Sequence, residues 1–266
     1  MRYLTTKNRA ILREMVVADF KVRYQESVLG YLWSLLKPLF MFAILFVLFT
    51  YIIPISKGHE HYGIMLLTGI VMWNFFSETT TMGANSVVNN GDLLRKISIP
   101  RYLMVLTSSM SALINLAINS LVIIVFAVVS GVHPTLEWIL VIPIFVELFV
   151  FSLGIAFLLA ALTVKFRDIT YIWEIFLQGG FYASVIIFPI TMVPESVRDY
   201  FYINPIVQMV QDARNFILGS SAGVETLWVD VDSIWLTIAP FAVILFFAVL
   251  GAWYFKRRSP YFAEDV

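Results

Sequence analysis

The sequence of 266 residues contains no cysteine, and charged residues make up only 14% of it. The absence of cysteine excludes disulfides, thiol nucleophiles and cysteine-ligated metals. Hydrophobic residues make up 60%, which is far above the proportion in soluble domains. The three histidines, His59, His61 and His133, have no carboxylate cluster beside them, so no metal site is predicted. These proportions exclude a water-soluble enzyme and indicate a chain that lies mostly in a lipid bilayer.

Most of the hydrophobic residues fall in six long apolar segments. A helix needs about 20 apolar residues to cross a hydrocarbon core of about 30 Å. The chain is therefore predicted to be an all-α integral membrane protein with six transmembrane helices in a single domain, residues 1–266. The predicted spans lie at about 36–55, 62–83, 103–129, 138–164, 169–188 and 234–255.

The basic residues are distributed unevenly about these spans. Of the eighteen Lys and Arg residues, only Lys57, Arg198 and Arg214 fall on the side opposite to both termini. Because basic residues concentrate on the cytoplasmic side of a membrane protein, both termini are predicted to be cytoplasmic.

The N-terminal region, residues 1–35, is predicted to contain an interfacial amphipathic helix over about 4–25. Apolar and basic residues fall on roughly opposite sides of a helical projection, although Val16 and Phe20 share the basic side. A helix that contacts both lipid and a partner protein fits this mixture, and a simple membrane anchor is the alternative. The apolar arc consists of Leu4, Ile11, Met15, Ala18 and Val22, and Arg9 and Arg13 lie opposite.

Two connecting segments carry structural signals of their own. In the inner segment, 84–101, the turn residues 89–92 precede a short apolar and basic helix that ends at Pro100. This pattern favours a docking element over an ordinary basic loop. In the outer segment, 189–219, Asn204 and Pro205 predict the start of a helix that stops at Gly219. A re-entrant pair of short helices and an amphipathic loop on the lipid surface both fit its spacing.

Few polar residues lie inside the predicted spans. Glu78, Glu147 and Glu174 are functional candidates because ionisable groups are costly in lipid. A proton-coupled carrier would pair such an acid with a basic residue inside a span, and the sequence offers none. Asn115 and Asn119 lie one helical turn apart and are predicted to bond to a neighbouring helix.

Four parts of the sequence together resemble the membrane permeases of ABC-type exporters of polysaccharides and polyol phosphates. The resemblance covers nearly the whole chain, in order and with the expected six spans. One departure is Ala183-Ser184, where many relatives carry Ser-Pro. The matching segments are Val16–Pro38, Asn90–Arg101, Phe166–Asp168, and the outer motif of Asn204–Pro205, Asp212–Arg214 and Leu218–Gly219.

The resemblance implies a homodimer of this chain with two copies of a cytoplasmic ABC ATPase. The chain itself lacks a Gly-x-x-x-x-Gly-Lys phosphate loop, so ATP and Mg would bind the partner and this chain would be no enzyme. The N-terminal helix and the inner segment would grip the ATPase. The residues expected at that contact are Asp19, Lys21, Asp92, Leu93, Leu94, Arg95, Lys96, Pro100 and Arg101.

The resemblance also makes 189–219 a pair of short re-entrant helices at an outer gate. The outer-gate residues are Pro189, Pro194, Asn204, Pro205 and Arg214. Aromatic rings stack on the apolar faces of sugars, and basic groups attract pyrophosphate, although lipid contact is the commoner role of any single Phe. The expected substrate path contains Arg23, Tyr24, Trp33, Lys37, Phe40, Phe46, Trp73, Phe181 and Tyr182.

The predicted function is therefore that of a permease in a bacterial cytoplasmic membrane. It would export an undecaprenyl-pyrophosphate-linked polysaccharide or teichoic acid, surrounded by membrane lipids and without a nucleic-acid partner. Export of a drug or another lipid by the same kind of machine is the nearest alternative. A membrane-embedded lipid-sugar transferase is disfavoured because the spans hold no clustered acid–base groups.

Overall fold

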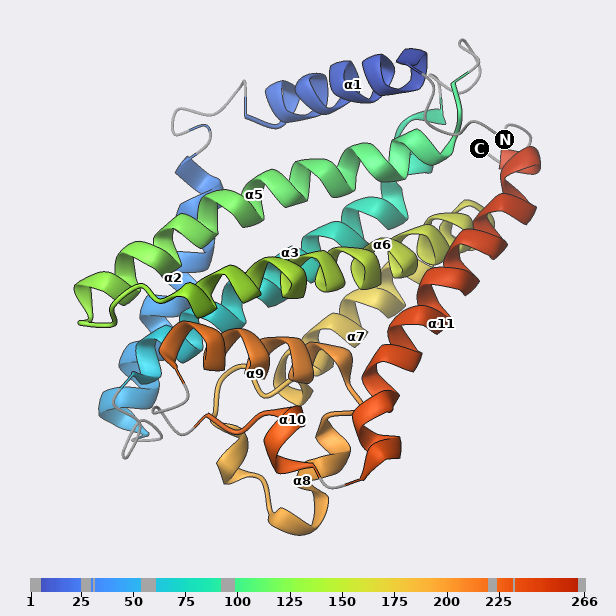
Figure 1. The fold of residues 1–266 in the computed structure, drawn as a ribbon. Coiled ribbons are helices and arrows are strands. Elements are labelled where there is room, and N and C mark those ends of the chain that lie inside the picture. Colours follow the sequence, from blue (N-terminus) through green and yellow to red (C-terminus); the bar gives the residue numbers. More distant parts are fainter. Residues whose placement is uncertain are drawn as a thin grey trace.

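The computed structural model describes residues 6–24, 30, 32–53, 61–91, 99–219, 224–231 and 233–262, and every regular element within these ranges is helical (Figure 1). The long helices lie side by side as a bundle, and the shorter α8, α9 and α10 gather at one end of it. The helices are α1 (Thr6–Tyr24), α2 (Leu32–Val47), α3 (Tyr62–Asn89), α5 (Tyr102–Val129), α6 (Val141–Lys165), α7 (Ile169–Ala183), α8 (Glu195–Phe201), α9 (Pro205–Leu218), α10 (Leu227–Asp230) and α11 (Ile234–Arg258).

Four continuous helical segments among the described residues are long and apolar enough to cross a membrane. They are 32–52, which is α2 with a π-helical turn at Leu48–Ile52, then α5, then α6 with the 3-10 turn Leu136–Leu140, and α11 with Ser259–Tyr261. The all-α membrane fold is thus confirmed. The assignment of α3 and α7 as further spans stays a prediction.

The fifth predicted span is wrong in its length. Helix α7 ends at Ala183 and has 15 residues, so it is only about 22 Å long. The chain then turns at Ser184 and at Val185, whose φ is +55°, and continues to Pro189 without helical structure. The apolar run 169–188 continues through this break because residues 185–188 are buried against protein or partly so, and burial demands apolar side chains in any backbone conformation.

Helix α3 is the centre of the bundle. It packs against α2, α5, α6, α7 and α9, and most of its side chains are buried. Its aromatic residues interlock with α6 and α7: the Phe76 ring stacks on Phe151 at 5.6 Å, and Trp73 meets Phe181 edge-on at 6.0 Å. Trp173 on α7 also donates a hydrogen bond to Thr80 Oγ1 at 3.0 Å.

Helices α6 and α11 cross at two glycines. A Cβ on Gly154 would lie 2.7 Å from the Ala248 Cα, and a Cβ on Gly251 would overlap the Gly154 carbonyl. Small residues at a crossing allow two membrane helices to approach backbone to backbone. The two glycines therefore set the distance between α6 and α11.

One arginine forms hydrogen bonds with the non-helical segment that follows α7. Arg214 on α9 is 1% exposed. Its Nε donates to the Met65 carbonyl at 2.9 Å, Nη1 to Val185 at 3.1 Å and Nη2 to Ile186 at 2.8 Å. The Tyr62 hydroxyl donates to the next carbonyl, that of Ile187, at 2.7 Å. Because the broken backbone cannot satisfy its own carbonyls, these side chains do so.

Helix α9 begins and ends as predicted. The Asn204 side chain accepts a hydrogen bond from the Ile206 amide at 3.0 Å, Pro205 is the first helical residue, and Gly219 with φ +81° follows the last. Most of its side chains are buried, and it contacts α3, α6 and α11. Pro194 stands immediately before α8.

Helix α1 lies along α5, and its predicted apolar arc is partly wrong. Asn8 donates to the Tyr102 hydroxyl at 3.0 Å, and Asp19 accepts from Ser111 at 2.7 Å. The two helices therefore run together over the first half of α5 (Figure 1). Val16 and Phe20 belong to the half-buried packing face, whereas the predicted Ala18 and Val22 are exposed; the packing face is Asn8, Ile11, Leu12, Met15, Val16, Asp19 and Phe20.

We predict that Arg214→Lys destabilises the protein by about 3 kcal/mol. A lysine keeps the charge but lacks the planar fork that reaches three carbonyls, and each orphaned buried acceptor costs about 1–3 kcal/mol. Thermal unfolding in detergent, followed by size exclusion, measures this loss. Arg198→Lys is the matched control, because Arg198 is partly exposed and pairs with Glu225 at 2.8 Å. Equal losses for both variants would contradict the assignment.

We also predict that Gly251→Ala destabilises the protein by roughly 1–3 kcal/mol, since the added methyl group forces α11 away from α6. Gly179→Ala on α7 is the control, because its Cβ would meet nothing within 4 Å. The same thermal assay compares them. A Gly251 variant as stable as the Gly179 variant would show that this crossing tolerates a side chain.

Candidate functional site: a polar pocket between α2, α3 and α5

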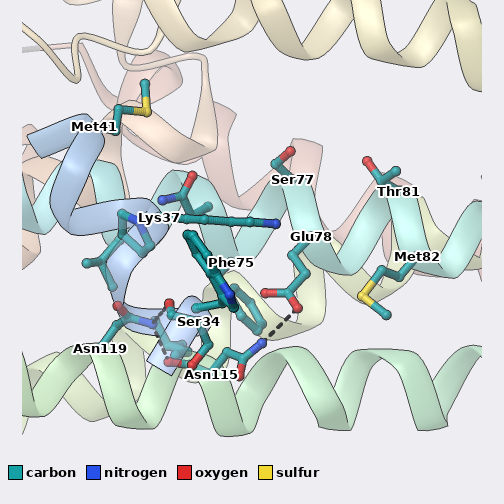
Figure 2. Close-up of a pocket in the computed structure, with 15 residues that line it drawn as sticks. Ser34, Lys37, Met41, Phe75, Ser77, Glu78, Thr81, Met82, Asn115 and Asn119 are labelled. Carbon is teal, nitrogen blue, oxygen red and sulfur yellow. Dashed lines mark hydrogen bonds between the residues drawn. The ribbon is translucent and has the colours of Figure 1, made fainter. Parts of the chain in front are cut away.

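A cavity of about 860 Å³ lies where α2, α3 and α5 meet. Both polar and apolar side chains line it. Figure 2 shows its side chains converging from the three helices. Its lining consists of Trp33, Ser34, Lys37, Pro38, Met41, Val71, Asn74, Phe75, Ser77, Glu78, Thr81, Met82, Asn115, Leu116 and Asn119.

The polar wall on α3 follows from helical spacing. Asn74, Ser77, Glu78 and Thr81 recur every three or four residues and therefore share one face of the helix. All four are partly exposed, whereas Thr79 and Thr80, which lie between them in sequence, are buried. The buried face of α3 thus packs in the core, and this polar stripe lines the pocket.

The opposite wall is formed by two asparagines of α5. Asn115 Nδ2 donates to Glu78 Oε1 at 2.8 Å, and Asn119 Nδ2 donates to the Ser34 carbonyl at 3.2 Å. The prediction that these amides bond to neighbouring helices is confirmed. The Asn115 Oδ1 is buried and accepts no hydrogen bond from a described residue.

The Ser34 carbonyl can accept a hydrogen bond from another helix because Pro38 removes its usual donor within α2. A residue four positions along a helix normally donates its N–H to this carbonyl, but Pro38 has none. Asn119 supplies the missing donor from α5. The proline in α2 and the asparagine in α5 together join these helices beside the pocket.

The mouth of the pocket carries an indole and a cation. Trp33 is 40% exposed, and Lys37 one turn further is also exposed. Together with the amides and Glu78, they offer an aromatic face, hydrogen-bond donors and acceptors, and one charge of each sign. Such a surface suits a polar ligand with apolar faces, held by several weak contacts. Glu78 is hydrogen-bonded to the Asn115 amide, which fixes its carboxylate in the wall of the pocket.

The remaining residues predicted for the substrate path lie elsewhere. Trp73 and Phe181 are buried in the core, and Phe46 packs on Phe42 at 5.5 Å. Phe40 and Tyr182 are exposed on the outer faces of α2 and α7. Arg23 and Tyr24 end α1, and their side chains lie outside the described residues.

The predicted outer-gate residues gather around the break after α7. Pro189 is buried, Pro194 is exposed, and Arg214 is the fully buried arginine described above. Asn204 also donates to the Ser184 hydroxyl at 3.0 Å. The residues are thus brought together, and Arg214 among them is a fully buried structural centre.

Of the predicted ATPase contacts, Asp92, Leu93, Leu94, Arg95 and Lys96 lie outside the described residues. Asp19 is hydrogen-bonded to Ser111 on α5, and Lys21 is exposed. Pro100 and Arg101 directly precede α5, whose first residue, Tyr102, contacts α1. The described parts of the two predicted docking segments therefore adjoin each other.

One buried polar cluster was not predicted from sequence. Glu147 on α6 lies beside Gln208 and Asp212 of α9, and Gln208 donates to Asp212 Oδ2 at 2.8 Å. Trp228 of α10 donates to the same oxygen at 3.1 Å. Within α9, the sequence pattern that indicates this cluster is the four-residue spacing of Gln208 and Asp212, which places both on one face of the helix. The cluster links α6, α9 and α10.

Comparison with known proteins identifies the family. A family model described as ABC-2 type transporter matches residues 12–218, from α1 to the end of α9. Among relatives, the O-antigen export system permease protein RfbA of Klebsiella pneumoniae is 27% identical over 247 residues, covering 92% of this chain and 91% of the relative. RfbA of Myxococcus xanthus is 25% identical over 260 residues, with 97% and 96% covered. The polysialic acid transport protein KpsM of Escherichia coli is 22% identical over 218 residues, with 79% and 82% covered.

The relatives are named as permease or transport proteins and not as enzymes, which supports a transport subunit. The resemblance carried by the four sequence segments is confirmed. Because the family model covers most of its length, the chain belongs to the ABC-2 type transporters, as an integral membrane permease subunit.

Proposed function

We propose that the protein is the permease subunit of an ATP-driven exporter that moves a lipid-linked polysaccharide across the bacterial cytoplasmic membrane. The observation that carries this proposal is the polar pocket between α2, α3 and α5, in a chain of this family. Relatives named for O-antigen export and polysialic acid transport support a carbohydrate cargo. With both termini cytoplasmic, the pocket lies in the inner half of the membrane, where a cargo made in the cytoplasm enters.

The chemistry of the pocket fits a sugar better than an apolar drug. Trp33 offers a ring for the apolar face of a pyranose, and Asn74, Ser77 and Asn115 offer donors and acceptors for its hydroxyls. Lys37 supplies a cation for the phosphate that joins sugar to undecaprenyl. Conduction requires many weak contacts rather than one tight site, and this mixed lining provides them. Teichoic acid, which also carries phosphate, is the second cargo that the same chemistry admits.

The assembly we propose is a homodimer with two ATPase subunits. Helices α2 and α7 each keep an apolar face exposed in the monomer, including Phe40, Ile44, Ile175 and Phe176. Pairing these faces across two protomers would enclose a path between them. The short α8 and α9 would then re-enter the membrane from outside, with their irregular backbone covered by protein, as hydrocarbon requires.

ATP binding by the partner would reach the path through α1 and the segment before α5. Asn8 and Asp19 fix α1 to α5, and Asn115 and Asn119 of α5 contact α3 and α2. A movement at the cytoplasmic end of α5 is therefore transmitted directly to two walls of the pocket.

We predict that Trp33→Ala lowers polymer export about two- to tenfold, because an aromatic contact contributes about 0.5–1.5 kcal/mol. Trp33→Phe should retain most of the activity. Surface polymer, quantified on intact cells and normalised to permease expression, provides the measurement. Trp235→Ala is the matched control, since Trp235 is 80% exposed on α11, away from the pocket. Export equal to wild type in Trp33→Ala would remove the pocket from the path.

We predict that Leu93→Asp together with Leu94→Asp greatly reduces co-purification of the ATPase, because two charges replace the apolar side chains of the proposed docking helix. His133→Asp with Thr135→Asp is the control, since both residues are exposed in the connection between α5 and α6, outside the docking segments and the spans. Pull-down of the tagged full chain with its ATPase gives the ratio of the two subunits. An unchanged ratio in the first pair would exclude this docking site.

A further inference from the structure

A second cavity, of about 620 Å³, opens at the end of the bundle where α5 begins and α11 ends. It shares no lining residue with the polar pocket. The elements around it are the start of α5, the middle of α6 and the last turns of α11. Two of its lining residues, Pro100 and Arg101, belong to the segment expected to contact the ATPase, and the groove lies outside the proposed export path.

Among the described residues, two cations and no acid line the groove. Arg101, which caps α5, and Lys256, in the last turn of α11, both line it, and its lining contains neither Asp nor Glu. Neither basic side chain hydrogen-bonds or pairs with a described residue. Arg257 and Arg258 follow Lys256 directly. Two unneutralised cations at one opening form a site for an anion.

The rest of the groove is apolar. Leu106, Phe157, Ala252 and Phe255 line it, and the small Ala252 leaves open space between α6 and α11. The wall is firm, because Phe255 meets Phe157 edge-on at 5.0 Å and Phe262 at 5.3 Å. An apolar slot that ends in two cations matches a molecule with a hydrocarbon chain and an anionic head.

We infer that this groove binds one anionic phospholipid of the inner leaflet. Its phosphate lies between Arg101 and Lys256, and one acyl chain lies along Leu106, Phe157 and Ala252. Basic pockets between helices on the cytoplasmic side of a membrane take such headgroups. A free phosphate would use only the charged end, and a glycan would find few hydrogen-bonding side chains here. Only the choice of leaflet rests on the proposed function.

The position of the groove gives the lipid a structural consequence. Tyr102 also lines the groove, and its hydroxyl accepts a hydrogen bond from the Asn8 side chain. A lipid in the groove therefore contacts the joint between α1, α5 and α11. Binding should stabilise this joint, at which the chain enters α5 from the proposed ATPase-docking segment.

Native mass spectrometry of the purified full chain, titrated with phosphatidylglycerol or with phosphatidylcholine of identical acyl chains, tests the inference. The wild-type chain should bind phosphatidylglycerol in clear preference. Each basic group near an anionic lipid contributes about a fivefold change in affinity. Arg101→Gln with Lys256→Gln should therefore weaken phosphatidylglycerol binding roughly 25-fold. Lys165→Gln with Arg167→Gln, exposed in the connection between α6 and α7, is the charge-matched control and should change it little.

A second variant tests the apolar slot. Ala252→Trp leaves both cations in place but fills the groove, so it should also weaken phosphatidylglycerol binding at least about fivefold. Wild-type elution on size exclusion establishes that each variant is folded. Equal effects of the two double variants, or equal binding of both lipids, would overturn the inference. Displacement of phosphatidylglycerol by equimolar inorganic phosphate or undecaprenyl pyrophosphate would overturn it too, in favour of a simple anion site or a cargo site. The assay contains no ATPase or polymer, so it is unaffected if the proposed export function fails.

Discussion

The buried guanidinium of Arg214 is the interaction on which the rest of this structure depends. Burying a cation is costly unless its hydrogen bonds are made, and here the backbone carbonyls of Met65, Val185 and Ile186 accept them. The same bonds satisfy the backbone that becomes free when α7 stops at Ala183. Helix α3 approaches closely enough because Gly69 has no side chain: a Cβ there would lie 2.9 Å from Nη2. One side chain of α9 is thus joined to α3 and to the segment after α7.

The same physical device occurs twice in the molecule. After α7 the freed carbonyls are satisfied by Arg214 and Tyr62, and in α2 the carbonyl freed by Pro38 is satisfied by Asn119. In both places the helical hydrogen bonding is interrupted, by the end of α7 in one and by Pro38 within the continuous α2 in the other, and a side chain distant in sequence supplies the missing donor. One interruption positions the buried α9, and the other borders the polar pocket. A bilayer allows interrupted helices only where protein or water meets their backbone, so the interruptions coincide with the parts proposed to handle the cargo.

Much of the fold and only part of the site was predictable from sequence. The limits of α9 followed from Asn204, Pro205 and Gly219 because capping is a local interaction. Trp33 and Lys37 were predicted for the path and do line the pocket. Trp73 and Phe181 were predicted on the same grounds of aromaticity but belong to the core. Aromatic residue type does not distinguish the two environments, since a ring is equally suited to packing against Phe76 and to stacking on a sugar.

The sequence by itself determined the all-α membrane fold and the positions of the apolar runs, because hydropathy acts through the surrounding solvent and requires no partner. It also determined the ends of helices that are capped by adjacent residues. Only the tertiary structure decided that Arg214 is a buried centre, that α7 ends at Ala183, and that Glu78, Asn115 and Trp33 face one cavity. Each of these depends on hydrogen bonds or packing between residues far apart in the chain, such as Arg214 and Met65, which are separated by 149 positions. No local sequence pattern indicates which distant donor will form a hydrogen bond with a free backbone carbonyl.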